Sequence, residues 1–474
     1  MAKGKALDGK PYAGNPHVRF DEGEVAPAAT PRRGSLLYKK LILTAAACAA
    51  IAANALTVTD VTARQRWPWN NLVDVDVTIS GSESDAEYRV TLSATCSGAD
   101  AATECKTLLT EPIVKGDATH RLTWDAGADL PGVRISGLVV TATVEPFAGD
   151  SAVYVVFDIT KGTTAGSWTR TYTSRGPDLS DDACRTTQLW MRRVPAGTFN
   201  MGLDFAGGEK PYDTATYAYF LPKHQVKLTK PYYLGVFELT QAQYNYLTGT
   251  WPSYFSNTTY RATRPVESVS FNGFRGSVPD GGDGTKGWYD DGTTVYSGSY
   301  LARLRTRTGI ATFDLPTEAQ WERACRAGRD GVFYSDSINQ WNVGSYGRSK
   351  TGWDTTGVNR DTAPDVGGTA KVGTYPPNPW GFYDMYGNVA ELCGDGNPYP
   401  HDISTPAPAA YTELRVDPRC TPELTNYAGA RTIRGGRWNQ FREHMNNGRR
   451  DSVAGSVSGG SEYSCGLRLC FTCE

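Results

Sequence analysis

Hydrophobic and polar residues alternate along the front of the chain in a pattern typical of β-strands. Residues 72–79 read LVDVDVTI, where from the second residue onward apolar side chains alternate with acidic or hydroxyl ones. Further segments of similar character, separated by turns that contain glycine or proline, follow at 88–95, 121–124, 138–144 and 154–159. Short strands at this spacing predict an all-β sandwich of the immunoglobulin or fibronectin type over residues 56–160. No catalytic residue types cluster in this region, so we expect a spacer or adhesion module.

The pattern changes after this region. Residues 161–188 are rich in Gly, Ser, Thr and Asp, a composition that predicts a linker. A second domain then occupies residues 189–474, and its best helix candidate is 317–327, with acidic residues in the early turns and a glycine just beyond. Residues 241–248 predict a second short helix, and we expect the remainder to consist of loops and short strands.

The N-terminal residues carry a signature of export. Lys39 and Lys40 precede an apolar run at 41–51, and the small residues ANA at 53–55 suit signal peptidase. We therefore interpret residues 1–55 as a leader with a secretory signal at about 39–55. The mature protein would then be periplasmic, cell-surface or secreted.

Two alternatives to a cleaved signal stay open. The apolar run is short for a bilayer crossing, so we expect no stable membrane span, but a single anchor is the competing interpretation. Lipidation of Cys48 is another. Residues 1–38 are polar and unlike the start of a signal, so we expect translation to begin near Leu36 or Leu37.

The charge and the cysteine content limit the class of partner and the cellular compartment that we expect for this protein. The 474 residues carry a formal net charge of -2 with a pI near 6.3, which gives no electrostatic reason to expect nucleic acid. Removing Cys48 with the signal leaves nine of the 10 cysteines, and an exported protein should pair most of them. Cys96 and Cys105 flank a polar loop and are candidates for a hairpin disulfide; the other pairings stay open.

A series of short motifs in the second domain carries a family resemblance. In chain order they are MRRVPAGTFNMG at 191–202, PYYLGVFELTQ at 231–241, RPVESVSF at 264–271, LPTEAQWE at 315–322, WGFYDMYGNVAE at 380–391, RGG at 434–436 and GLR at 466–468. Together they resemble the formylglycine-generating enzyme, or sulfatase-modifying-factor, family. The resemblance implies an α+β domain related to C-type lectins, which the all-β sandwich precedes.

The resemblance also implies structural calcium. Calcium prefers mixed carboxylate and carbonyl oxygens from a tight loop, which the glycine of DMYGNVAE would permit. The implied ligands are the side chains of Asp384 and Glu391 with the carbonyls of Gly387 and Val389. A second and looser site would fall near Asn342, Val343 and Asp365.

Family enzymes oxidise a substrate cysteine to formylglycine with oxygen and hold Cu(I) between two thiolates. Soft thiolates select Cu(I), and the family places them five residues apart after a Gly-Gly-Ser turn. Here Arg437 replaces the serine, while Gln440 and Met445 replace the two cysteines. An amide and a thioether do not replace two thiolates, so copper is not expected.

Other residues offer poor substitutes for this chemistry. Cys465 and Cys470 have the family's separation but flank a predicted strand, where residues five apart point to opposite faces. Cys470 and Cys473 form a single CxxC at the chain end, for which a disulfide is the simpler interpretation. The iron-dependent relatives use a histidine cluster, whereas the 5 histidines here are scattered.

The segment at 437–451 is dense in residue types that dominate recognition surfaces. We expect it to line the former active cleft and to bind a protein, a small molecule or a glycan. The candidate ligand-binding residues are Arg437, Trp438, Gln440, Phe441, Arg442, Glu443, His444 and Arg449.

Several interpretations of this segment remain. Its position resembles that of the diversified segment in variable proteins of diversity-generating retroelements, which share this fold. Its aromatic and Arg residues could instead only pack the domain. A formylglycine-generating oxidase that acts on a protein cysteine is the alternative function.

Overall fold

The computed structural model describes residues 19–20, 56–66, 71–83, 86–97, 102–147, 153–203, 222–276, 295–334, 368–396, 414–419, 430–440, 445–454 and 464–473. The expected signal at about 39–55 lies outside these residues and stays a prediction. Within the described stretches, no helix combines the length and the apolar character needed to cross a bilayer.

The chain divides into two compact units. The first comprises Met1–Ser151 together with Thr171–Ser174, and the second comprises Ala152–Arg170 and Arg175–Glu474. The short strand β10 (Arg170–Thr173) lies at this division.

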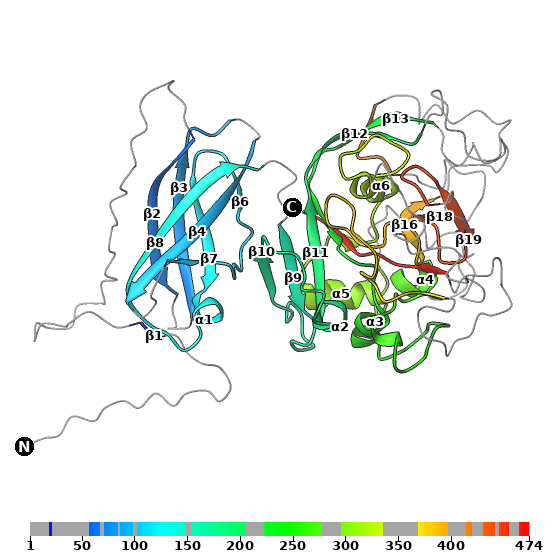
Figure 1. Ribbon diagram of the computed structural model, residues 1–474, viewed down its shortest axis with the longest axis horizontal. Coiled ribbons are helices and arrows are strands. Elements are labelled where there is room, and N and C mark those ends of the chain that lie inside the picture. Colours follow the sequence, from blue (N-terminus) through cyan, green and yellow to red (C-terminus); the bar gives the residue numbers. More distant parts are fainter. Residues whose placement is uncertain are drawn as a thin grey trace, which may run out of the picture. The chain divides into compact units, whose positions relative to one another are not determined.

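The first unit is built from strands in two sheets (Figure 1). One sheet has the order β2-β3-β7; the other has the order β1-β8-β4-β5, with β6 paired to β4. The predicted alternation on β3 is confirmed, because Val73, Val75 and Val77 are buried while Asp76 pairs with Arg121 of β7. The elements are β1 (Arg19–Phe20), β2 (Thr57–Gln65), β3 (Leu72–Ser80), β4 (Glu87–Ser97), β5 (Thr103–Glu104), β6 (Ile113–Lys115), β7 (Thr119–Asp125), α1 (Ala126–Asp129) and β8 (Arg134–Pro146).

The candidate hairpin disulfide is wrong, because Cys96 and Cys105 are both free thiols. The N–H of Cys105 donates to the carbonyl of Leu92 at 2.9 Å, which places Cys105 opposite that residue of β4. Cys96 lies four residues further along the strand, about 13 Å away at the usual rise. A disulfide requires the two Cα atoms within about 7 Å.

The second unit combines three small sheets with short helices. Its largest sheet contains the antiparallel order β9-β11-β14-β21-β15, so strands from both ends of the unit lie side by side. The other two sheets have the orders β12-β13-β17 and β19-β18-β16-β20. The strands are β9 (Tyr154–Asp158), β11 (Gln188–Val194), β12 (Gly197–Met201), β13 (His224–Leu228), β14 (Tyr232–Gly235), β15 (Phe313–Asp314), β16 (Ala390–Gly396), β17 (Arg415–Val416), β18 (Ala430–Arg434), β19 (Asp451–Ala454), β20 (Cys465–Gly466) and β21 (Cys470–Thr472).

Both predicted helices are confirmed, and their ends follow from local chemistry. Helices α3 and α6 begin after Thr240 and Thr317, and each threonine forms a capping box with a glutamine three residues later. The helices of this unit are α2 (Ala183–Thr186), α3 (Gln241–Thr248), the 3-10 helix η2 (Arg261–Thr263), α4 (Phe271–Arg275), α5 (Tyr300–Thr308) and α6 (Glu318–Arg326).

Two predicted boundaries differ from the structure. Residues 154–159 form a strand as expected, but β9 pairs with β11 and belongs to the second unit rather than to the front domain. The expected linker at 161–188 is instead folded, and apart from Thr171–Ser174, which belongs to the first unit, it is part of the second unit. Arg185 is buried there, and its guanidinium donates to the carbonyl of Val372 at 2.7 Å. The polar composition of residues 161–188 gave no indication that Arg185 is buried.

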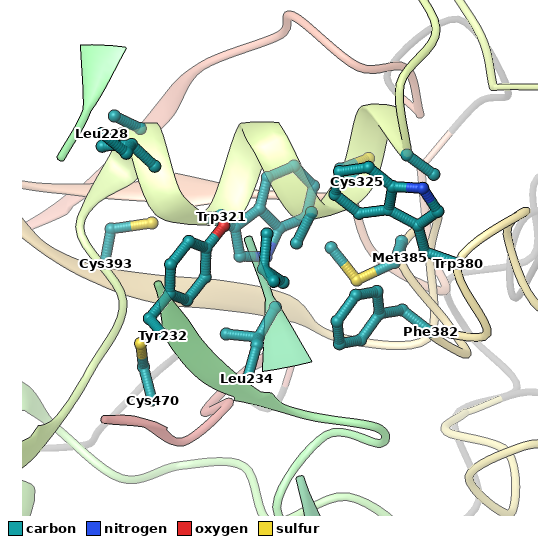
Figure 2. Packing of buried hydrophobic residues seen from close by; sticks show 14 of the residues in the cluster. Leu228, Tyr232, Leu234, Trp321, Cys325, Trp380, Phe382, Met385, Cys393 and Cys470 are labelled. Atoms are coloured by element: carbon teal, nitrogen blue, oxygen red, sulfur yellow. The ribbon is translucent and has the colours of Figure 1, made fainter. Parts of the chain in front are cut away.

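Helix α6 supplies the centre of the core. Trp321 is fully buried, and Tyr232, Leu234, Phe382 and Met385 belong to the same hydrophobic cluster (Figure 2). The helix thus holds together the β14 strand and the loop that precedes β16. This packing positions the candidate site.

Candidate functional site

The predicted calcium loop is a tight and buried turn before β16. Asp384 and Asn388 adopt left-handed backbone conformations, with φ of 56° and 59°, and Gly387 lies between them at φ 88°. The Asp384 carboxylate accepts the Gly373 N–H at 2.6 Å through Oδ2. Its Oδ1 is buried and has no hydrogen-bond partner among the described residues.

Three buried carboxylates share this region. Burial raises the pKa of Asp384 to about 6, although the hydrogen bond from the Gly373 N–H and the charge of Arg468 act to lower it. The charge of Glu391 adds to the rise. Burial also raises the pKa of Glu238 well above its usual value, with further contributions from Asp384 and Glu391. The region therefore holds three acidic groups beside the guanidinium of Arg468, which is ion-paired with Glu391.

Glu391 differs from the other two carboxylates because it is ion-paired. It accepts two hydrogen bonds from Arg468, at 2.6 and 2.8 Å, and one from the Trp321 indole N–H at 2.6 Å. These bonds link α6, β16 and the closing GLR motif in the interior. Sequence reasoning did not anticipate this role, since the predicted partner of Glu391 was an ion.

The arrangement fits a cation in part. The unpartnered Asp384 Oδ1 and the excess of buried acidic groups favour one. Among the described residues, however, no three Asp, Glu, His or Cys side chains form a group that could hold a metal. A calcium ion would therefore rely on Asp384 and on main-chain carbonyls such as those of Gly387 and Val389, with Glu391 mainly committed to Arg468.

The RGG motif forms the turn that leads into the predicted ligand segment. Arg434 is buried at the end of β18, where it pairs with Glu318 and Glu322 of α6. Gly435 follows with φ 91°, and a side chain there would lie 3.3 Å from both the Met385 carbonyl and the Trp321 ring. Only glycine fits this approach without displacement.

A small pocket opens beside this turn. Its lining contains Gln440 and Arg449, two of the predicted ligand-binding residues, and no cysteine. The lining residues are Ala390, Ile433, Arg434, Gly435, Gly436, Gln440, Arg449 and Asp451. The structure therefore brings part of the predicted segment to a hollow beside the predicted calcium loop.

Arg437 and Trp438 lie half-buried at the start of the segment. The Arg437 guanidinium donates to the Ser464 hydroxyl at 3.1 Å, and the Trp438 ring meets Phe255 edge to face at 5.5 Å. Phe255 belongs to a loop fixed by buried Glu267, whose carboxylate accepts the Tyr254 and Phe255 N–H groups. Phe255 therefore forms one side of the site. The sequence did not predict this contact, because no motif or spacing pointed to Phe255.

The two positions that match the copper cysteines lie in different environments. Gln440 is half-buried at the pocket, whereas Met445 is fully buried in the core cluster around Trp321. Cys465 and Cys470 are buried on strands of two different sheets. The part of the site that the structure describes thus brings no cysteine pair to the pocket.

Several predicted residues lie outside the described residues. They are Phe441, Arg442, Glu443 and His444 of the ligand segment, and Asn342, Val343 and Asp365 of the second calcium site. Their roles stay predictions.

Comparison with known proteins identifies the second unit. The profile of the sulfatase-modifying factor enzyme 1-like domain matches residues 177–472, so this domain begins within the stretch that the sequence predicted as linker. The strand-rich arrangement with few helices is consistent with the α+β fold that the resemblance implied.

Individual relatives match shorter stretches. A formylglycine-generating enzyme of Thermomonospora curvata is 37% identical over 127 residues, which are 26% of this chain and 37% of that protein. The serine/threonine-protein kinase pkn1 of Chlamydia pneumoniae is 30% identical over 134 residues, 28% of this chain and 17% of that protein. The chain thus spans well under half the length of these curated relatives.

Among solved structures, Treponema denticola variable protein 1 is similar with 19% identity and a TM-score of 0.40. The match covers 60% of this chain and 95% of that chain.

Proposed function

The chain belongs to the sulfatase-modifying factor enzyme 1-like family, and we propose that it is an exported, non-catalytic binding protein on that scaffold. Its ligand would be a protein, a glycan or another small molecule, held at the pocket beside the RGG turn. The front unit would serve as an immunoglobulin- or fibronectin-like spacer or adhesion module.

The environment of Met445 carries this proposal. At the position that matches the second copper cysteine, the side chain is fully buried and packs with the core around Trp321. A thioether in the core and an amide at the pocket rim do not provide the two thiolates that Cu(I) requires. The described lining of the pocket contains polar side chains but no cysteine.

The remaining residues suit recognition. Trp438 offers flat contact area, while Arg437, Gln440 and Arg449 offer directed hydrogen bonds. Phe441, Arg442, Glu443 and His444 would extend the same surface. The position of this segment also supports the hypothesis of a variable protein, which a reverse transcriptase gene and a template repeat beside this gene would establish.

We further propose a structural calcium ion at the loop of Asp384. The ion would supply positive charge to the buried acidic groups. Asp384 and the carbonyls of Gly387 and Val389 would hold it, and Glu391 would remain the partner of Arg468. The second site at Asn342 and Asp365 is a further candidate.

The alternative function is a formylglycine-generating oxidase. The 37% identity to the Thermomonospora curvata enzyme favours it, although the match covers only 127 residues. In this case Cu(I) would bind and a substrate cysteine would lose its sulfur.

One experiment separates the two functions. The full chain is titrated with Cu(I) against a competing chelator and incubated with oxygen and a cysteine-containing peptide, whose aldehyde product is followed by mass spectrometry. We expect neither stoichiometric copper binding nor aldehyde, and either result in the unmodified chain would overturn the binding proposal. In parallel, arrays of defined glycans and peptides are probed with the chain and with Trp438→Ala, using the exposed Tyr246→Ala as control; binding that Trp438→Ala leaves unchanged would refute the assigned site.

A further inference from the structure

The CxxC motif at 470–473 does not form the disulfide that its sequence favoured. Cys470 and Cys473 are both reduced thiols in the structure. Cys470 is buried at the first position of β21, and Cys473 is half-buried directly after the last position of that strand. The proposed ligand-binding role uses neither thiol.

Strand pairing keeps the two thiols apart. β21 runs antiparallel to β14, with Leu234 opposite Cys470, and the Cys473 N–H donates to the Pro231 carbonyl at 3.0 Å. Three residues of extended chain separate the Cα atoms by about 10 Å, and side chains an odd number of residues apart point to opposite faces. A disulfide requires Cα atoms within about 7 Å. This pairing and a bond between the two sulfur atoms therefore exclude each other.

The residues before the motif are firmly anchored. The Arg468 guanidinium is fully buried, pairs with Glu391 and donates to the carbonyls of Gly235 and Val236. The Leu469 carbonyl accepts the Gly235 N–H at 2.8 Å. Movement at this end would break a buried ion pair, which is costly.

The residues at the end of the motif are closer to solvent. Thr472 and Cys473 are both half-buried. The Thr472 carbonyl accepts the Thr312 hydroxyl at 2.8 Å, and its own hydroxyl accepts the Gln320 side-chain N–H at 3.4 Å. Release of these two residues breaks neutral hydrogen bonds and no buried ion pair. A bond between the two thiols would therefore move the Cys473 end.

We propose that Cys470 and Cys473 form a redox switch, in which oxidation of the two thiols to one disulfide releases residues 472–473 from β14. The oxidant is a small-molecule disulfide such as oxidised glutathione. The Cys473 thiolate attacks one sulfur of that molecule and expels a thiolate. The Cys470 thiol then loses its proton to water, attacks the Cys473 sulfur and expels the second thiolate. Two protein thiols become one disulfide, and the small disulfide becomes two thiols.

The burial of Cys470 sets the order of these steps. Burial raises the pKa of the Cys470 thiol well above its usual value, and the charges of Asp314 and Cys473 add to the rise. A buried and protonated thiol is a poor nucleophile, so Cys470 reacts second, once the strand end has opened. Tyr232 and Leu234 of β14 belong to the core cluster around Trp321, so the oxidation state would determine how firmly one side of that core is held.

The test uses the full chain in buffers with a graded ratio of oxidised to reduced glutathione. Trypsin cleavage after Arg468 yields residues 469–474, which contain both thiols of the motif, and mass spectrometry shows whether this peptide has lost two hydrogen atoms. Hydrogen exchange of a peptide with residues 231–235 reports the pairing of β14. We expect the disulfide to form and exchange to become about tenfold faster. Because pairing opposes the bond, the folded chain should need at least about tenfold more oxidised glutathione than the chain in urea.

Two variants separate the switch from general oxidation. Cys473→Ser should leave the exchange of 231–235 unchanged at every glutathione ratio. The matched control is Cys96→Ser, which removes a half-buried thiol of the first unit and should respond as the unmodified chain.

The unmodified chain decides the proposal even if a variant fails to fold. A disulfide within 469–474 that leaves the exchange of 231–235 unchanged would overturn the release of the strand end. A folded chain whose peptide stays reduced, or carries glutathione alone, while the chain in urea forms the disulfide would overturn the switch. Neither result bears on the proposed ligand-binding site, which the arrays test separately.

Discussion

Replacing Met445 with alanine tests whether the position of the second copper cysteine has become part of the core. The Met445 side chain is fully buried and packs in the cluster that contains Trp321, Cys325, Met385 and Tyr386. Truncation of a buried methionine typically destabilises a protein by about 2–5 kcal/mol, through lost transfer free energy and the cavity left behind. Because none of the Met445 side chain is exposed, we expect about 3 kcal/mol.

Gln440→Ala is the comparison within the same segment. Gln440 is half-buried at the pocket rim, so its truncation should change the free energy of unfolding by no more than about 0.5 kcal/mol. The contrast between the two variants is the prediction. The core position should affect stability, and the rim position should affect binding.

The assay must report on the second unit, because a chain with two units need not unfold in one step. Calorimetry gives the midpoint, which should fall by about 2–4 °C for each kcal/mol in a domain of this size. Hydrogen exchange of a peptide around Trp321 confirms which unit is affected. A Met445→Ala variant within about 0.5 kcal/mol of the unmodified chain would show that Met445 is not a core residue, and the proposed loss of the copper site would lose its structural support.

Two further predictions concern buried ionisable groups. Burial opposes ionisation of Glu322, but the charges of Arg326 and Arg434 hold its pKa below the usual value. The variant Glu322→Gln would remove a negative charge from beside both buried guanidinium groups. In urea unfolding, Glu322→Gln should lower the free energy of unfolding by about 3–5 kcal/mol. The exposed control Glu104→Gln should lower it by no more than about 0.5 kcal/mol. Equal losses in the two variants would contradict the buried ion-pair network. Burial lowers the pKa of His224 below 6.5, with a further contribution from the charge of Arg450. The His224 side chain therefore binds a proton more readily in the unfolded chain than in the folded one. The free energy of unfolding should consequently fall as the pH drops from about 7 to 5. His224→Gln should reduce that slope in urea unfolding at several pH values, whereas an unchanged slope would assign it to other groups.

The sequence was most informative where local chemistry decides the outcome. Both helices begin after a threonine that forms a capping box, and such a cap can be recognised from a Thr followed three residues later by Gln. The strand at β3 could be predicted because its side chains alternate with period two. The family followed from the order of short motifs, and the profile match confirms it.

The sequence was least informative where a residue's partner is distant in the chain. The stretch at 161–188 was predicted as a linker from its polar composition, whereas the burial of Arg185 within it depends on a carbonyl contributed by Val372. Glu391 was predicted to bind an ion, but it also pairs with Arg468 and with the Trp321 indole. Phe255 was not anticipated as the wall behind Trp438, since no spacing rule connects the two.

The amino-acid sequence alone determined the family, the capped helices and the alternating strands, because each depends on neighbours within a few residues or on motif order. Only the tertiary structure decided that Met445 lies in the core and that Gln440 and Arg449 reach one pocket. These outcomes depend on contacts between segments far apart in the chain. Burial and charge pairing arise only when those segments meet, so no local pattern could reveal them.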